Sequence, residues 1–288
     1  MPFKEAVTIA RELGKIRISL PVSLSALAGY TLLSGHVGWP GFLLAVGVLM
    51  MSCGSATINH IQESETDILM SRTRGRPIPS GRISVRGAIA VAAAFVVTGS
   101  LILLAGFPWM AFALSWITLL WYNLVYTPLK KITAFAVIPG SVTGALPPVI
   151  GWVAAGGGVS DPQILIVASF FFIGQIPHFW LLLLMFGDQY KEAGLPTLNG
   201  IFTPTQIKRI SFFWILATIA NAFLVIGYVF TDKILSFFVL LYVFFLVFSL
   251  LFRFLLQSEF HPRPAFLRLN LLYLFMMILL VVEGLLRH

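Results

Sequence analysis

The most telling shortage in this 288-residue sequence is of charge, because only 10% of the residues are Asp, Glu, Lys or Arg. A soluble domain has about 25% charged residues, so this chain has too few to cover a globular surface in water. Cysteine is nearly absent too: Cys53 is the single one, which excludes an intramolecular disulfide. A soluble enzyme, a disordered chain and a disulfide-stapled domain are therefore excluded.

What the chain has instead is hydrophobic sequence, which makes up 58% of its residues. A helix needs about 20 mostly apolar residues to cross a bilayer whose hydrocarbon core is about 30 Å thick. Nine runs meet this requirement and no long linker divides them, so we expect one all-α polytopic membrane domain over residues 1–288. The nine predicted transmembrane helices are residues 18–35, 40–58, 87–106, 108–127, 134–153, 163–186, 209–231, 234–252 and 266–286.

The basic residues predict how these spans are oriented. Seventeen of the 19 Lys and Arg residues lie in the N-terminal segment or after even-numbered spans, and only Lys233 and Arg287 lie on the opposite side. Because cytoplasmic loops carry the excess of Lys and Arg, the N-terminus is predicted in the cytoplasm and the C-terminus outside. The net charge of +8 therefore indicates membrane orientation and not nucleic-acid binding.

Residues 1–17 precede the first span and are expected at the cytoplasmic surface of the membrane. Residues 3–16 resemble an amphipathic interfacial helix, because its charged residues share one stripe. These are Lys4, Glu5, Arg11, Glu12 and Lys15. A signal peptide cleaved near Ala28 is disfavoured, since the polar region before it is long and contains acidic residues.

Two clusters of acidic residues follow spans on the predicted cytoplasmic side. Asn59, Glu63 and Asp67 come after the second span, and their four-residue spacing would place them on one face of a helix. Asp188 and Glu192 follow the sixth span with the same spacing. Carboxylates near membrane depth are costly and therefore indicate function. Both clusters belong to the same membrane face, so they are able to oppose one another.

Carboxylate and amide oxygens are ligands that suit Mg²⁺, which often reaches a protein together with substrate phosphate. Arginines follow the first cluster directly, and a guanidinium group binds phosphate oxygens in a bidentate manner. These residues are Arg72, Arg74, Arg76 and Arg82. We therefore predict a Mg²⁺-diphosphate site. The alternative for the arginines is that they are solvated loop charges that orient the protein.

Two further elements carry weaker signals. Lys130 could neutralise a phosphate oxygen and Tyr126 could donate a hydrogen bond, although both residue types are also ordinary anchors at a membrane interface. His178 lies within the sixth predicted span. It could bind a haem iron, contact a substrate carboxylate, or form a hydrogen bond in the core.

At these residues the chain resembles the UbiA superfamily of intramembrane prenyltransferases. Asn59, Glu63 and Asp67 match its N-x-x-x-D-x-x-x-D signature with Glu in the middle, and Tyr126 and Lys130 match its Y-x-x-x-K element. Within the superfamily, several segments are similar to the branch that makes heme O. They are MSRTRGRPIPSGRIS (70–84), GALPPVIGWVAAGG (144–157), PHFW (177–180), DQYKEAGLPTL (188–198) and AFLRLNLLYLFMM (265–277). Gln189 departs from the pattern, since an acid is usual there.

This resemblance implies a nine-helix UbiA-type bundle in the cell (inner) membrane. It implies transfer of farnesyl from farnesyl diphosphate to the 2-vinyl group of protoheme IX, with Mg²⁺ as cofactor and heme B as substrate. The implied catalytic residues are Asn59, Glu63, Asp67, Lys130 and Asp188. The implied metal ligands are Asn59, Glu63, Asp67, Asp188 and Glu192. The implied substrate contacts are Arg72, Arg76, Tyr126, His178, Lys191 and Glu192. A heme A synthase or a terminal oxidase assembly is the implied class of protein partner, and the sequence itself identifies none.

Three alternatives differ from this reading. A UbiA-type enzyme that prenylates a quinone-precursor aromatic is closest, and the PHFW segment argues against it. A transporter should carry charges at the bilayer midplane or on both faces, whereas these lie nearly all on one face. A haem-binding electron carrier needs a second axial ligand, but the other histidines lie in loops or at the terminus: His36, His60, His261 and His288.

Overall fold

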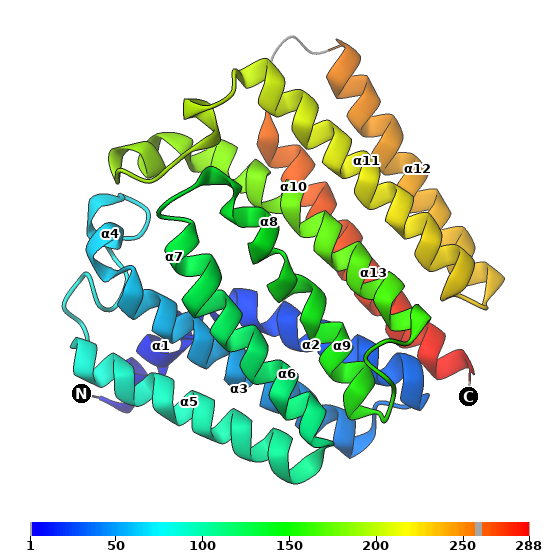
Figure 1. Ribbon diagram of the computed structural model, residues 1–288, viewed down its shortest axis with the longest axis horizontal. Helices are drawn as coiled ribbons and strands as arrows, with labels where there is room; N and C mark the ends of the chain where they lie inside the picture. The colour runs from blue at the N-terminus through cyan, green and yellow to red at the C-terminus, as the bar shows by residue number, and fades with distance from the viewer. Residues whose placement is uncertain (1, 257–260, 288) are drawn as a thin grey trace.

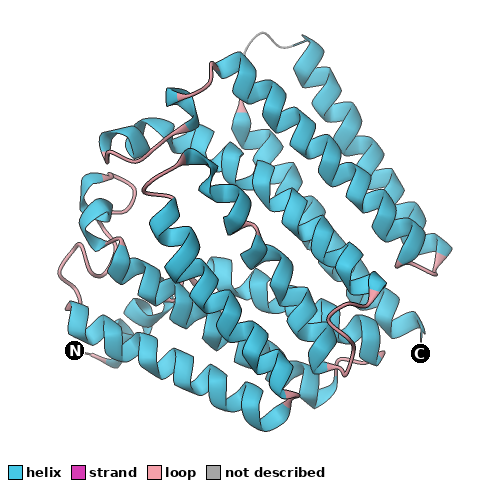
Figure 2. Cartoon of the chain, in the orientation of Figure 1, coloured by secondary structure: helices cyan, strands magenta, loops and turns pink. Residues whose placement is uncertain are grey.

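A computed structural model describes residues 2–256 and 261–287, and within these ranges the chain is helical and has no strand (Figures 1 and 2). The longer helices are α1 (Phe3–Leu13), α2 (Ile16–Ser34), α3 (Gly38–Gln62), α5 (Val85–Gly106), α6 (Trp109–Leu120), α9 (Val142–Ala154), α10 (Pro162–Glu192), α11 (Pro204–Tyr228), α12 (Lys233–Leu256) and α13 (Pro262–Arg287). The short ones are α4 (Ser64–Leu69), η1 (Trp121–Tyr126), α7 (Thr127–Leu129), η2 (Ala134–Ala136), α8 (Val137–Gly140) and η3 (Leu198–Gly200).

In the described residues, eight helical segments are long and apolar enough to cross a membrane. They match eight of the nine predicted spans to within a few residues, because a sustained apolar run leaves the chain few alternatives to a helix. At the remaining predicted span, residues 234–252, α12 supplies a shorter apolar stretch, Lys233–Ser249. The predicted count of nine is therefore not confirmed.

The segments that carry the predicted site lie at one end of the bundle. Figure 1 shows α4, the end of α7 and the last turns of α10 together, with the C-terminus at the opposite end. Both short connections at that opposite end follow the prediction: α5 ends at Gly106 before α6 begins at Trp109, and α9 ends at Ala154 before α10 begins at Pro162.

Helices α2 and α9 approach each other backbone to backbone. A Cβ atom on Gly29 would lie 2.0 Å from the carbonyl oxygen of Pro148, and one on Gly151 would lie 1.7 Å from that of Ala26. Only glycine fits at either position. Helices in lipid associate through such close packing and not through the hydrophobic effect, so these two glycines allow α2 and α9 to pack in direct backbone contact.

The N-terminal helix α1 forms as expected, but one of its predicted surface charges lies elsewhere. Ile9 and Leu13 are buried beside Ala88 of α5. The placement of Lys15 on the charged stripe is wrong, because α1 ends at Leu13 and Lys15 takes a left-handed conformation with φ 45° and ψ 51°. That turn directs its side chain away from the stripe.

Two predicted helical runs are interrupted at the same end of the bundle. The run through Asn59 and Asp67 breaks at Glu63, whose φ and ψ are −107° and 2°, so that Asp67 belongs to α4. The fourth predicted span changes from α-helix to π-helix over Trp121–Tyr126. Interruptions of this kind often mark functional sites, since they redirect side chains.

Candidate active site

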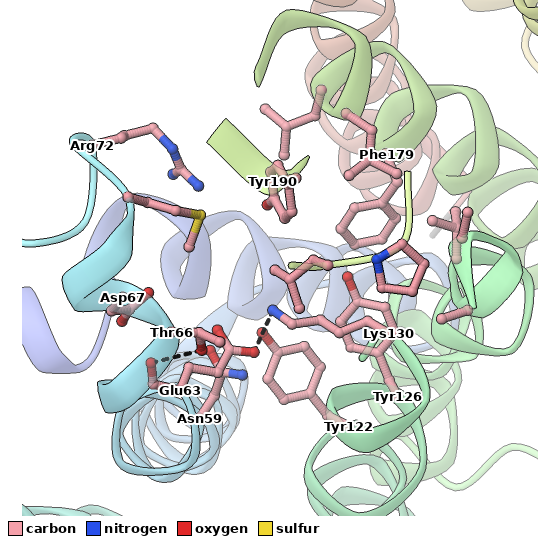
Figure 3. Close-up of a pocket in the computed structure, with 18 of the residues that line it drawn as sticks. Asn59, Glu63, Thr66, Asp67, Arg72, Tyr122, Tyr126, Lys130, Phe179 and Tyr190 are labelled. Carbon is pink, nitrogen blue, oxygen red and sulfur yellow. Dashed lines mark hydrogen bonds and ion pairs between the residues drawn. The ribbon is translucent and has the colours of Figure 1, made fainter. Parts of the chain in front are cut away.

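A cavity lies between the end of α3, the η1–α7 segment and α10 (Figure 3). Seven of the predicted site residues line it: Asn59, Glu63, Asp67, Arg72, Arg76, Tyr126 and Lys130. They come from segments up to 71 residues apart in sequence, so the fold assembles the first acidic cluster, the arginine loop and the Y-x-x-x-K element in one place. Phe179, Leu182 and Leu183 of α10 add an apolar part to the wall.

The acidic wall is buried. Asn59, Glu63 and Asp67 have exposed fractions of 1%, 5% and 0%. The predicted continuous helix is wrong, because the chain breaks at Glu63, but all three side chains line the same cavity. Buried carboxylates must be compensated, which makes their partners the next question.

The side-chain oxygens of Asn59, Glu63 and Asp67 each bind a basic side chain of the same protein. Arg76 Nη1 donates to both carboxylate oxygens of Asp67, at 2.8 and 2.7 Å. Lys130 Nζ forms an ion pair with Glu63 (Figure 3). Lys15 Nζ donates to Asn59 Oδ1 at 2.6 Å. Three of the four basic side chains that line the cavity, Lys15, Arg76 and Lys130, therefore face three ligand oxygens, and Arg72 is the fourth.

This clustering of charge alters the acidity of its members. Burial raises the pKa of Glu63, but Lys130, Lys15 and a hydrogen bond from Asn59 together lower it by more, so the net pKa lies below its usual value. Burial, with repulsion from Arg76, lowers the pKa of Lys15 to about 7. The Glu63 carboxylate is therefore ionised at neutral pH.

The orientation of the Asn59 amide is set by the neighbouring helix. Asn59 Nδ2 donates to Thr127 Oγ1 at 3.1 Å, and Thr127 Oγ1 donates to the carbonyl oxygen of Tyr122 at 2.9 Å. One helical turn away, Asn123 Nδ2 donates to Ser55 Oγ at 2.8 Å. These contacts join α3 to the π-helical segment and leave the Asn59 carbonyl pointing toward Lys15.

The π-helix also supplies two tyrosines to the cavity. Tyr122 and Tyr126 both line it, with ring centroids 5.4 Å apart, and Tyr126 contacts Phe179 of α10 at 5.7 Å. Tyr122 was not predicted as a site residue. Its position would have revealed it, because Tyr122, Tyr126 and Lys130 repeat the four-residue spacing of the acidic wall.

The second predicted acidic cluster does not face the first in this structure. Asp188, Lys191 and Glu192 are exposed and do not line the cavity. A break in α10 at Phe186, with φ −125° and ψ 15°, instead brings Tyr190 to the cavity wall.

The arginine loop touches this segment as well. The backbone N–H of Arg72 donates to Gln189 Oε1 at 3.3 Å, and the Arg72 guanidinium lies 4.9 Å from the Phe186 ring centroid.

The donor set fits a hard cation by its chemistry. Among the described residues, no three His, Cys, Asp or Glu side chains gather closely enough to hold a metal ion. The buried wall of one amide oxygen and two carboxylates is nevertheless what Mg²⁺ uses together with phosphate oxygens. Asn59, Glu63 and Asp67 are the residues able to hold it.

His178 lies on α10 but outside the lining of the cavity. Its Nδ1 is 2.7 Å from Asn270 Oδ1 on α13, and its ring lies 4.8 Å from the Phe266 ring. An amide oxygen only accepts hydrogen bonds, so Nδ1 carries the proton and Nε2 keeps its lone pair. Asn270 is a partner that the sequence did not indicate.

Known proteins resemble this chain over most of its length. The model of the UbiA prenyltransferase family matches residues 22–279. A protoheme IX farnesyltransferase from Geobacter sulfurreducens is 41% identical over 188 residues, which are 65% of this chain and 68% of that protein. Another from Oleidesulfovibrio alaskensis is 38% identical over 205 residues, or 71% and 72% of the two chains.

Solved structures share the fold. A UbiA homologue from Archaeoglobus fulgidus bound to GPP and Mg²⁺ aligns with a TM-score of 0.73 and 18% identity, covering 96% of this chain and 98% of that one. A UbiA homologue from Aeropyrum pernix aligns with a TM-score of 0.72 and 17% identity, covering 93% and 98%. The all-helical polytopic membrane architecture is thus common to them and to this chain.

Proposed function

This chain belongs to the UbiA prenyltransferase family, and from that premise we propose that it transfers farnesyl from farnesyl diphosphate to the 2-vinyl group of protoheme IX, releasing pyrophosphate and giving heme O. The observation that carries the donor half is the cavity itself, in which oxygen donors face cations beside an apolar wall. The acceptor is supported by relatives at 38–41% identity that are named protoheme IX farnesyltransferase.

The first step breaks the bond between C1 of the farnesyl group and the diphosphate oxygen. Arg72, Arg76 and Lys130 line the cavity and neutralise the charge that builds up on the departing pyrophosphate. Fixed charges act strongly in a site that excludes water, because they need no reorganisation when the bond breaks. Tyr126 lies in the same wall and donates a hydrogen bond to the leaving group.

The second step forms the new carbon–carbon bond. The π electrons of the haem vinyl group attack C1 of the allylic cation, which places positive charge on the vinyl carbon next to the porphyrin ring. Water adds to that carbon and loses a proton, so the vinyl becomes a hydroxyethyl group that carries farnesyl. The rings of Tyr122, Tyr126 and Phe179 line the cavity and stabilise the cation through their faces.

Asn59, Glu63 and Asp67 would hold Mg²⁺, which when bound neutralises further charge on the pyrophosphate. A fold relative bound to GPP and Mg²⁺ supports this assignment. Asp188 and Glu192 lie outside the cavity lining, and they would complete the set only after the segment beyond the break at Phe186 turns toward the cavity. Lys191, between them, would contact a phosphate oxygen.

We assign the haem contact to His178. Asn270 holds its ring so that the Nε2 lone pair is free to contact the haem iron. The protein would lie in the cell (inner) membrane, with the N-terminus and the site in the cytoplasm and the C-terminus outside. The basic residues of the cavity support this orientation. A phosphatase reporter fused after His288 should be active outside the cytoplasm, and activity of a cytoplasmic reporter at that position would contradict the orientation.

The test of the function is the mass of the product. Purified protein with heme B, farnesyl diphosphate and Mg²⁺ should yield haem whose mass has increased by one farnesyl and one hydroxyl group. Parallel reactions with a chelator, or with the Asp67→Asn variant, should leave heme B unchanged. A further reaction supplies a quinone-precursor aromatic acid in place of heme B and should give no product. A prenylated aromatic acid there, with heme B left unchanged in the first reaction, would indicate a quinone-precursor acceptor instead.

A further inference from the structure

Lys15 stands out in its backbone. It is the only non-glycine residue of the described chain with a positive φ, at 45°. L side chains rarely take this conformation, and where they do the strain is often found at functional sites. Here it occurs at the turn between the surface helix α1 and the first spanning helix α2.

The strained turn places a lysine where a surface residue was expected. The Lys15 side chain is half-buried and lines the cavity, and its Nζ lies 2.6 Å from Asn59 Oδ1. The other end of the Asn59 amide is fixed by Thr127, so its oxygen stays aimed at the cavity. Lys15 thus occupies the direction from which a metal ion would approach that oxygen.

Among the three basic side chains that bind the Asn59, Glu63 and Asp67 oxygens, Lys15 is the easiest to displace. Arg76 and Lys130 compensate buried carboxylates, and moving either one leaves a buried negative charge. Lys15 bonds instead to a neutral amide oxygen. Arg76 and Lys130 also repel it, while Glu63 and Asp67 attract it.

We propose that Lys15 exchanges one binding partner for another. In the substrate-free protein its ammonium group donates a hydrogen bond to the Asn59 carbonyl. When a divalent cation binds that carbonyl, the ammonium group moves and donates to a diphosphate oxygen instead. The proposal rests on the metal-diphosphate site of the proposed function. Lys15 would therefore compete for the Asn59 carbonyl with a metal ion that binds without diphosphate, and it would itself bind the diphosphate when that is present.

The Lys15→Met variant keeps the length of the side chain and loses the charge. It should bind pyrophosphate more weakly and a metal ion alone more tightly. The Kd for inorganic pyrophosphate with Mg²⁺ should rise about tenfold, because a charged hydrogen bond is lost. The Kd for Mn²⁺ alone should fall severalfold, because the competitor is gone. Calorimetry on the full-length protein in detergent measures both.

Arg17→Met is the matched control, since it removes the same charge two residues away from an exposed position outside the cavity lining. Both affinities should stay at the wild-type value. Lys15→Gly guards against failure to fold, because glycine accepts the positive φ. It should melt no lower than the wild type and still lose pyrophosphate affinity.

Pyrophosphate affinity that is unchanged in both Lys15 variants would overturn the proposal. So would a parallel loss of both affinities with a lower Tm in Lys15→Met, which would indicate a purely structural turn. Wild-type protein that binds neither probe would overturn the metal-diphosphate site itself and the exchange with it. The two kinds of failure are therefore distinguishable.

Discussion

Buried carboxylates occur at both ends of this molecule, and they are held in different ways. At the candidate site, Glu63 and Asp67 are held by side chains of Lys130 and Arg76, which also line a cavity. At the opposite end, Glu283 is fully buried in α13 and accepts hydrogen bonds from the backbone N–H groups of Thr231 and Asp232 and from two side chains. The two side chains are the Thr231 hydroxyl and Arg287, whose Nε lies 2.8 Å from Glu283 Oε1.

The difference lies in how freely the partners can move. Backbone N–H groups at the α11–α12 connection cannot leave Glu283 unless that connection unfolds, so this carboxylate acts as a structural lock. Lys130 and Arg76 hold their carboxylates through side chains alone, which can turn to another anion once a metal ion compensates the carboxylates. A buried acid is therefore a candidate for chemistry when its partners are mobile and a cavity adjoins it.

Asp67→Asn, at the candidate site, should have the largest effect of the variants proposed here, and the effect should be on turnover. The amide keeps the size of the side chain and loses the charge that binds Arg76 and the predicted metal ion. We expect turnover to fall about a hundred- to a thousandfold, as when a charge-stabilising group is removed from an active site. Heme O formation measures the rate, and an unchanged Tm shows that the fold is intact. Near-normal turnover in folded protein would remove the metal-site argument.

Glu283→Ala should show the reverse pattern. It leaves Arg287 and the Thr231 N–H without their partner, so we expect a loss of stability of about 3–5 kcal/mol. The turnover of protein that remains folded should match the wild type. Thermal unfolding in detergent and turnover well below Tm measure the two effects. A selective loss of turnover would mean that the two ends are coupled.

His178→Ala tests a polar group that lies outside both ends. If Nε2 contacts haem, haem affinity should fall about tenfold or more, while farnesyl diphosphate affinity stays nearly constant. The reason is that the diphosphate depends on the residues that line the cavity, and His178 is not among them. Haem titration followed in the Soret band measures the first affinity and calorimetry the second. Equal losses for both ligands with a lower Tm would indicate a core histidine only.

Thr127→Val should have the smallest effect, and it tests whether Thr127 positions the Asn59 amide at the candidate site. Valine keeps the shape and removes the oxygen that accepts from Asn59 Nδ2, so we expect Mn²⁺ affinity to fall about three- to tenfold. Thr127→Ser should restore it. Thr118→Val is the matched control, since Thr118 makes a similar hydroxyl-to-carbonyl bond in α6 and lies outside the cavity lining. A similar loss in the control would exclude a specific role.

Much of the site could be predicted because its motifs are local. The four-residue spacing of Asn59, Glu63 and Asp67 places them together even though the helix breaks, since a turn of α4 restores the direction. Tyr126 and Lys130 are also four residues apart, and both line the cavity. The facing of Asp188 and Glu192 toward the first cluster was not found, because the break at Phe186 alters which side of α10 reaches the cavity.

The sequence alone determined eight of the nine predicted spans and the local motifs, because each depends on residues adjacent in the chain or on the length of an apolar run. Only the tertiary structure decided that Lys15 meets Asn59 across 44 residues and that Asn59 meets Thr127 across 68. Neither pairing has a periodic signal. Each depends on how one helix is rotated against another and on a local distortion, the left-handed Lys15 or the π-helix, that packing stabilises and propensity disfavours.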